Sequence, residues 1–144
     1  MENSLISLIR MSCVLLIFAG LINTSTAFAQ VSKTHPAVFL IFFDWQQDTI
    51  SPDAMTIIQQ AADTWRSRKA EKVQIIGYTD RSLAVDESQR SSERMANNVA
   101  NELIRRGIQK DKLIVSGRGE NDNRVPTMAG VQEPQNRRVE VVMP

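Results

Sequence analysis

The chain has 144 residues, of which 42% are hydrophobic, and its formal net charge is +1 at pH 7. This length accommodates one domain, and a charge so close to balance gives no electrostatic reason to expect nucleic acid or an anionic membrane surface as a partner. The single cysteine, Cys13, lies near the amino terminus, so the chain beyond it carries no disulfide and no thiol chemistry.

The first 29 residues have the features of a secretory signal peptide. An apolar run over 12–22 precedes Ala27-Phe28-Ala29, which has small residues at the two positions that define a cleavage site. The run is shorter than the about 20 residues that a membrane-spanning helix needs, and Cys13 lacks the small residues of a lipid-attachment site before it. We therefore predict a cleaved signal peptide over 1–29, a short lead over 30–36 and one domain over 37–144. An uncleaved membrane anchor is the alternative.

The first half of the domain shows one strand pattern and one helix pattern. Residues 37–43 form a continuous apolar run, which is typical of a strand that is covered on both faces or central in its sheet. Ser51-Pro52-Asp53 predicts a helix start, because serine caps a helix and proline fits its first position. Apolar residues recur at helical spacing from there to Trp65, and cations close the last turn at Lys69.

The second half predicts three strands and one helix. A strand over 72–78 is followed by a loop over 79–86 and a helix from about 87 to 106, which Gly107 ends. Apolar residues predict the last two strands at 113–115 and 139–143, with an ordered loop between them.

This order of elements, β-α-β-α-β-β, predicts an α/β (α+β two-layer) fold with the helices on one face of a four-stranded sheet. The second and third strands are joined through a helix and should therefore be parallel. The order of the strands within the sheet does not follow from these patterns.

Two motifs stand at the ends of predicted strands. Gly77-Tyr78-Thr79-Asp80 ends the second strand, and a helix containing Ser92 and Ala96 follows it. Asn136-Arg137-Arg138 leads into the last strand. Together, at this spacing, they resemble the OmpA-like (OmpA/MotB C-terminal) peptidoglycan-binding domain family. Its pattern is an apolar strand ending in Gly-x-Thr-Asp and a helix opening with Leu-Ser-x-x-Arg-Ala. The resemblance covers about residues 38–142 and implies a mixed sheet.

The resemblance also implies a ligand, the diaminopimelate residue of the peptidoglycan stem peptide. It assigns the binding site to five residues: Asp80, Thr79, Asp44, Asn136 and Arg137. A carboxylate such as Asp80 suits the ammonium of that ligand, and a guanidinium is the natural bidentate partner of its carboxylate.

The chain departs from the family pattern at one charged position. Met95 stands where the family has arginine, and Arg94 lies one residue before it. One helical residue is a rotation of about 100°, so we expect Met95 at the edge of the apolar stripe, Arg94 pointing away from it, and Arg137 as the compensating cation. Loss of a charge-assisted contact costs about 1.5–3 kcal/mol, roughly 10- to 100-fold in affinity. We therefore predict a weakened site.

Two functions remain open at this point. The first is a non-enzymatic periplasmic module that contacts the stem peptide and is associated with the cell wall or outer membrane. The second is a degenerate domain that has lost this ligand and serves as a protein-protein interaction module with envelope proteins as partners. An enzyme is not expected, because the chain lacks the nucleophile motifs of hydrolases and metal ligands at useful spacing. No cofactor is expected, and the only histidine, His35, should be solvated.

Overall fold

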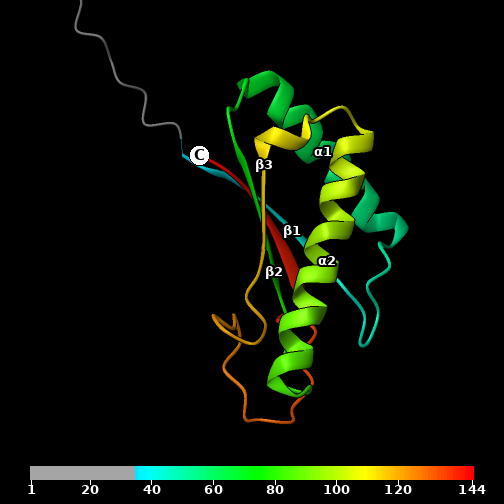
Figure 1. The fold of residues 1–144 in the computed structure, drawn as a ribbon, viewed down its shortest axis with the longest axis vertical. Coiled ribbons are helices and arrows are strands. Elements are labelled where there is room, and N and C mark those ends of the chain that lie inside the picture. Colours follow the sequence, from blue (N-terminus) through cyan, green and yellow to red (C-terminus); the bar gives the residue numbers. More distant parts are fainter. Residues whose placement is uncertain (1–34) are drawn as a thin grey trace, which may run out of the picture. The chain divides into compact units, whose positions relative to one another are not determined.

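The computed structural model describes residues 35–144 (Figure 1), which form a four-stranded sheet and two long helices. The strands are β1 (Ala37–Phe42), β2 (Val73–Tyr78), β3 (Leu113–Gly117) and β4 (Arg138–Met143), and the helices are α1 (Pro52–Arg68) and α2 (Val85–Arg105). A short 3₁₀ helix, η1 (Lys110–Lys112), precedes β3. The predicted order of strands and long helices is confirmed. The predicted signal peptide lies outside the described residues.

Local chemistry sets the helix boundaries. Ser51 caps α1 as predicted, since its Oγ accepts a hydrogen bond from the N–H of Ala54 at 3.2 Å. α2 begins at Val85, two residues before the predicted start, because the N–H of Ser88 already bonds to the carbonyl of Ala84. Gly107 follows α2 with a φ of +94°, the left-handed conformation that glycine adopts readily at the end of a helix.

The strands are arranged in the order β1-β4-β2-β3. β2 and β3 are parallel, as predicted, whereas β4 is antiparallel to both of its neighbours, β1 and β2. The sheet is therefore mixed, as the resemblance implied. The last strand in the sequence thus lies between the first and second, and it places the chain around Arg137 beside the end of β2.

The prediction that the first apolar run is covered on both faces or central is wrong. β1 is an edge strand, paired only with β4 among the described strands. Ile41 is fully buried under the helices, but Val38 and Phe42 on the opposite face are 51% and 44% exposed. The continuous apolar run therefore covers the core with one set of side chains and meets solvent with the other.

Both helices cover the same face of the sheet, α1 over β1 and α2 over β2 and β3 (Figure 1). α2 lies close to the sheet, because a Cβ on Gly77 would stand 2.0 Å from the carbonyl oxygen of Ser92. A Cβ on Gly117 would stand 2.4 Å from the Ser92 Oγ. These two glycines bring the first turns of α2 against the carboxyl ends of β2 and β3. The largest buried side chains of the core beneath the helices include Ile41, Ile58, Ile75, Met95, Leu103 and Val141.

Candidate functional site

Asp80 stands at the carboxyl end of β2, where its carboxylate is 1% exposed. Its Oδ1 accepts hydrogen bonds from the N–H of Ser82 at 3.1 Å and from the hydroxyl of Ser82 at 2.5 Å. Its Oδ2 accepts bonds from the N–H of Glu133 at 3.1 Å and from Nη1 of Arg137 at 2.6 Å. Both carboxylate oxygens are therefore occupied by the protein's own donors, and a buried charge requires such partners.

These contacts determine the charge of Asp80. Burial by itself raises the pKa of the Asp80 carboxyl, but the hydrogen bonds from Ser82, Arg137 and the Glu133 N–H outweigh it and hold that pKa below its ordinary value. Asp80 is therefore an anion at neutral pH.

Arg137 connects this carboxylate to the end of β1. Its side chain is 11% exposed, and its Nε donates to the carbonyl of Phe43 at 3.3 Å. The backbone N–H of Phe43 in turn bonds to the carbonyl of Arg137 at 3.0 Å. The guanidinium thus lies between Asp80 and the first residue after β1, held by both.

Thr79 and Asn136 are buried behind this pair. The N–H of Thr79 donates to the carbonyl of Gly119 at 2.8 Å, while its Oγ1 has no hydrogen-bond partner among the described residues. The amide of Asn136 bonds to both backbone groups of Val125, accepting from the N–H at 2.9 Å and donating to the carbonyl at 2.8 Å. Asn136 therefore fixes the loop between β3 and β4 and is itself inaccessible to a ligand.

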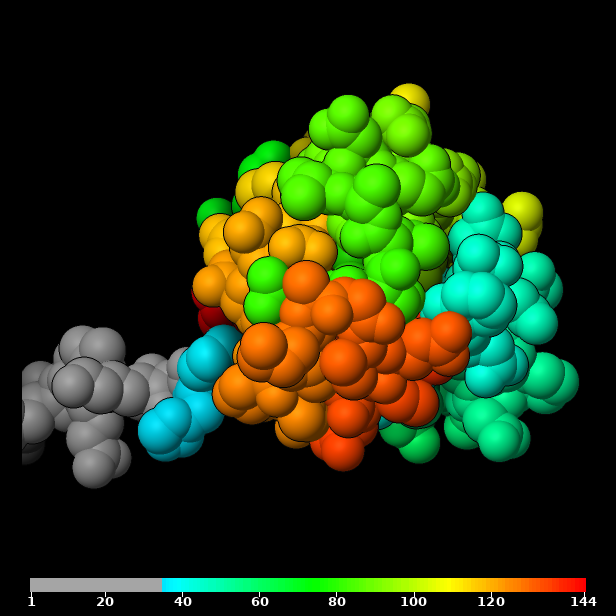
Figure 2. All heavy atoms as spheres, turned by 90° about the horizontal axis from the view of Figure 1, so that it is seen from below, coloured from blue at the N-terminus to red at the C-terminus, as the bar shows by residue number. Residues whose placement is uncertain are grey.

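That loop closes the end of the molecule. Figure 2 shows it, in orange, filling the space between the start of α2 and the β1–α1 loop. It reaches Asp80 through Glu133, and the N–H of Gly130 bonds to the carbonyl of Arg81 at 2.6 Å.

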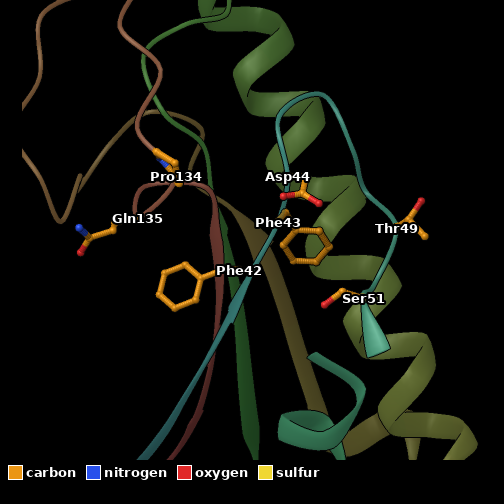
Figure 3. A pocket seen from close by; sticks show the side chains of 7 residues that line it. All are labelled: Phe42, Phe43, Asp44, Thr49, Ser51, Pro134 and Gln135. Carbon is orange, nitrogen blue, oxygen red and sulfur yellow. The ribbon is translucent and has the colours of Figure 1, made fainter. Parts of the chain in front are cut away.

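Asp44 belongs to a different part of the site. It is exposed and lines an open cavity of about 350 Å³ at the end of β1. The other lining residues are Phe42, Phe43, Thr49, Ser51, Pro134 and Gln135 (Figure 3). Neither Asp80 nor Arg137 lines this cavity. The five predicted residues therefore gather at one end of the sheet, but Asp44 alone faces open space and the other four form a closed polar cluster.

Met95 lies within the hydrophobic core and is 2% exposed, further inside than the predicted edge of the stripe. Arg94, one residue earlier, points into solvent as expected. It pairs with Glu87 at 2.8 Å and approaches Asp48 of the β1–α1 loop at 3.6 Å. These ion pairs connect the β1–α1 loop to α2. Arg94 also lines a cavity of about 340 Å³, and Asp80 is not among the residues that line it.

Two partners of Asp80 were missed by the sequence analysis. Ser82 stands two residues after Asp80, a spacing at which an aspartate side chain often accepts a hydrogen bond from the backbone N–H. The sequence therefore could have predicted this contact. Glu133 donates through its backbone N–H, and no sequence pattern marks such a donor.

Within residues 35–144, no group of acidic, histidine or cysteine side chains is arranged to bind a metal ion. None of the helices in that part of the chain combines the length and apolarity that a membrane span requires.

A model of the OmpA family matches residues 42–137. The chain belongs to the OmpA family. OmpA-like domains are non-enzymatic modules, which confirms the prediction that this chain is not an enzyme.

An outer membrane protein of Gluconacetobacter diazotrophicus is 34% identical in an alignment of 118 residues that covers 78% of this chain and 31% of that relative. The chain therefore spans about a third of the length of this relative.

Solved structures agree with the family at the level of the fold. The OmpA-like domain of FopA1 from Francisella tularensis has a TM-score of 0.67 at 22% identity, over 75% of this chain and 71% of that one. The peptidoglycan-associated lipoprotein from Burkholderia pseudomallei has a TM-score of 0.66 at 19% identity, over 72% of this chain and 88% of that one. The relatives named as outer membrane proteins and lipoproteins are proteins of the cell envelope.

Proposed function

We propose that this OmpA-family domain is a non-enzymatic periplasmic module that binds the diaminopimelate-containing stem peptide of peptidoglycan through a weakened site. The proposal rests on the placement of Asp80. This anion is held at the carboxyl end of β2 beside a guanidinium, and the family motif assigns it to the ligand-binding site. The names of relatives, such as the peptidoglycan-associated lipoprotein, support the ligand class.

The weakening has two physical causes. A ligand ammonium must compete with Arg137 for a carboxylate whose oxygens already accept four hydrogen bonds. The second cause is the absence of a cation at position 95, where Met95 is enclosed by the core and Arg94 is engaged by Glu87 and Asp48. Each missing charge-assisted contact weakens binding by about 10- to 100-fold.

Arg137 supplies part of what is missing. Its Nε and Nη1 are occupied by Phe43 and Asp80, whereas Nη2 donates to no described residue. Nη2 is therefore the donor that remains for a ligand carboxylate, and the exposed carboxylate of Asp44 near the same end of β1 is the acceptor that remains for an ammonium.

The experiment is co-sedimentation with purified sacculi that contain diaminopimelate. Asp80→Asn keeps the shape of the side chain and removes its charge, so we expect it to abolish binding. Asp111→Asn is the matched control, because Asp111 is exposed in η1 at the other end of β3. Equal sedimentation of the wild type and the Asp80→Asn protein would remove Asp80 from the site.

Met95→Arg tests the cause of the weakening. If the new guanidinium reaches the ligand, the affinity for sacculi measured by sedimentation should increase about 10- to 100-fold. Because Met95 is buried, the unfolding free energy of this variant is measured in parallel, and only a folded variant is compared. A folded Met95→Arg protein that binds no better than the wild type would show that the missing arginine is not the cause.

The second candidate is the degenerate domain that binds envelope proteins instead. The enclosed state of Asp80 favours it, since a ligand can reach that carboxylate only by displacing the protein's own donors. It is supported if the wild-type protein does not sediment with sacculi and Met95→Arg restores sedimentation.

Periplasmic location follows the same reasoning, because relatives are envelope proteins and residues 1–29 have the pattern of a signal peptide. Mass spectrometry of the protein recovered from the periplasm should show Gln30 as the amino terminus. An amino terminus before Gln30 would favour the retained anchor.

A further inference from the structure

The free edge of β1 is unusual among the surfaces of this domain. In an antiparallel pair, alternate residues direct their backbone N–H and C=O groups to the partner strand. The N–H of Phe43 bonds to the carbonyl of Arg137, so the backbone groups of Phe43 face β4. Because the direction alternates, the backbone groups of Ile41 and Phe39 face β4 as well. Val38, Leu40 and Phe42 must therefore direct their backbone groups away from the sheet. Within residues 35–144, no strand or side chain bonds to these groups.

This edge lacks the devices that usually protect an edge strand, which are charges, prolines within the strand and bulges. β1 contains six uncharged residues and pairs with β4 in unbroken register. The opposite edge, β3, has five residues and is also uncharged, but Lys110 and Lys112 of η1 stand before its first residue. Three apolar side chains, those of Val38, Leu40 and Phe42, alternate on the outer face of β1, where a strand added to this edge would extend the surface.

α1 packs against β1 and reaches the start of its free edge. Arg66 of α1 bonds to the carbonyl of Arg106 at the end of α2, which identifies the flank of α1 that faces α2. Ile57 and Arg68 lie on the other flank, since helical residues advance by about 100°. Arg68 Nη1 bonds to the carbonyl of His35 at 2.8 Å, just before β1 begins. The edge therefore has a cation at its first end.

The other end of the edge opens into the cavity beside Asp44. Figure 3 shows the rings of Phe42 and Phe43 on the two sides of β1, with Thr49 and Ser51 towards the helix and Pro134 and Gln135 on the far side. Asp44 is at the rim, exposed, and forms no ion pair with a described residue. The exposed ring of Phe42 and the exposed carboxylate of Asp44 fit a side chain with an apolar stem and a positive end, such as lysine or arginine.

From this geometry we propose that the free edge of β1 binds an extended segment of another polypeptide as a fifth strand, with a basic side chain of that segment in the cavity beside Asp44. Backbone hydrogen bonds to Val38, Leu40 and Phe42 provide affinity, and the cavity provides selectivity, as in other complexes formed by strand addition. The charge of Asp44 favours a basic segment. A second copy of this chain is disfavoured, because a two-fold axis through the edge would bring two α1 helices against each other on the same face.

The test uses isotopically labelled protein, purified as the expressing bacterium processes it, and a synthetic capped peptide of seven residues, Lys-Thr-Val-Thr-Val-Thr-Val, which reaches from Asp44 to Val38. Antiparallel pairing would place its lysine opposite Asp44. We expect the amide resonances of Val38, Leu40 and Phe42 to shift on titration and their hydrogen exchange to slow. A peptide with norleucine in place of lysine should bind about threefold more weakly, the size of one exposed ion pair. Absence of shifts at these three amides at millimolar peptide would overturn the proposal.

Two variants separate the backbone contact from the charge. Leu40→Pro removes an N–H that faces away from β4, a position at which an edge strand tolerates proline, and should abolish peptide binding. Asp44→Asn keeps the strand intact and should bind the lysine and norleucine peptides equally. A preference for lysine that persists in Asp44→Asn would overturn the assignment of the cavity.

The outcome is distinguishable from that of the peptidoglycan proposal. Leu40 has no role in the site around Asp80, so Leu40→Pro protein should sediment with sacculi as the wild type does. Circular dichroism establishes that the variant is folded. If the free edge amides are already protected without peptide, and the mass in solution doubles with concentration, the occupant is a second copy and the proposal is wrong.

Discussion

The corner formed by Asp80, Ser82, Glu133 and Arg137 differs from the free edge of β1 in how its polar groups are hydrogen-bonded. At the corner, a carboxylate that is 1% exposed accepts four hydrogen bonds from Ser82, Glu133 and Arg137. At the edge, the backbone groups of Val38, Leu40 and Phe42 have no partner among the described residues. A polar group buried without a partner is costly, whereas one in contact with water is not. The buried carboxylate of Asp80 therefore has partners within the protein, whereas the exposed backbone groups of β1 remain available for a partner.

This difference also separates two ways of binding. A ligand at the corner has to replace a contact that already exists, so its net gain is small. A strand at the edge of β1 replaces water alone. The comparison predicts that substitutions at the corner change stability as well as ligand binding, whereas substitutions at the edge act mainly on association.

The largest effect is expected for Arg137→Ala. It leaves Asp80 as a buried anion without a counter-ion, and breaking a buried pair in this way costs about 3–5 kcal/mol. Urea denaturation measures the change in unfolding free energy. Arg124→Ala is the control, because Arg124 is exposed in the loop before β4 and should change stability by no more than about 0.5 kcal/mol. Equal small losses for both variants would show that the Asp80–Arg137 pair is not the anchor of the corner.

A smaller loss is expected for Gly77→Ala. The new Cβ would stand 2.0 Å from the carbonyl oxygen of Ser92, so α2 must move away from β2. Such overpacking typically costs about 1–3 kcal/mol. Gly130→Ala is a useful contrast, because it has open space around it and its strain arises only from a φ of +82°. Thermal unfolding of the two variants compares a steric cost with a backbone cost, and a Gly77→Ala protein as stable as the wild type would contradict the close approach of α2.

Acid should weaken the corner before it affects the edge. The pKa of Asp80 is lower in the folded chain than in the unfolded chain, where it is about 3.9. The unfolded state therefore binds the proton more readily, so this contribution to stability is fully present above about pH 4 and is lost as the pH falls through the folded pKa. Unfolding free energy measured against pH should have a smaller slope in this range for Asp80→Asn than for the wild type. Identical slopes would mean that Asp80 is not the group responsible.

The smallest effect on stability is expected for Val38→Thr. The side chain is 51% exposed on the outer face of β1, and threonine retains a high strand propensity, so unfolding free energy should change by no more than about 0.5 kcal/mol. Ile41→Thr, on the inner face of the same strand, should cost much more because Ile41 is fully buried. Chemical denaturation of this pair tests whether the two faces of one apolar run have different roles.

The sequence predicted the elements well where local chemistry decides them. Ser51 and Pro52 specify the start of α1, Gly107 specifies the end of α2, and each acts within one turn of chain. The prediction for the first strand failed, because burial of both faces was inferred from composition alone. β1 is an edge strand, and its position depends on pairing with β4, about 100 residues away.

The same division holds for the candidate site. The motif predicted that Asp80, Thr79, Asn136 and Arg137 gather, and they do at the end of β2. It did not predict that Asp80 would be enclosed by Ser82 and Glu133, or that Asp44 would face a separate cavity. Enclosure is a property of the loop between β3 and β4, whose path depends on Asn136 holding Val125.

The sequence by itself determined the order of elements, the motif residues and the replacement of the family arginine by Met95. Each of these follows from residue type and spacing, because short-range hydrogen bonds and helical periodicity relate the sequence directly to local structure. Only the tertiary structure decided which strand lies at the edge, which carboxylate is closed and which is open. Those outcomes depend on non-local pairing, where β4 inserts between β1 and β2 and carries Arg137 to Asp80.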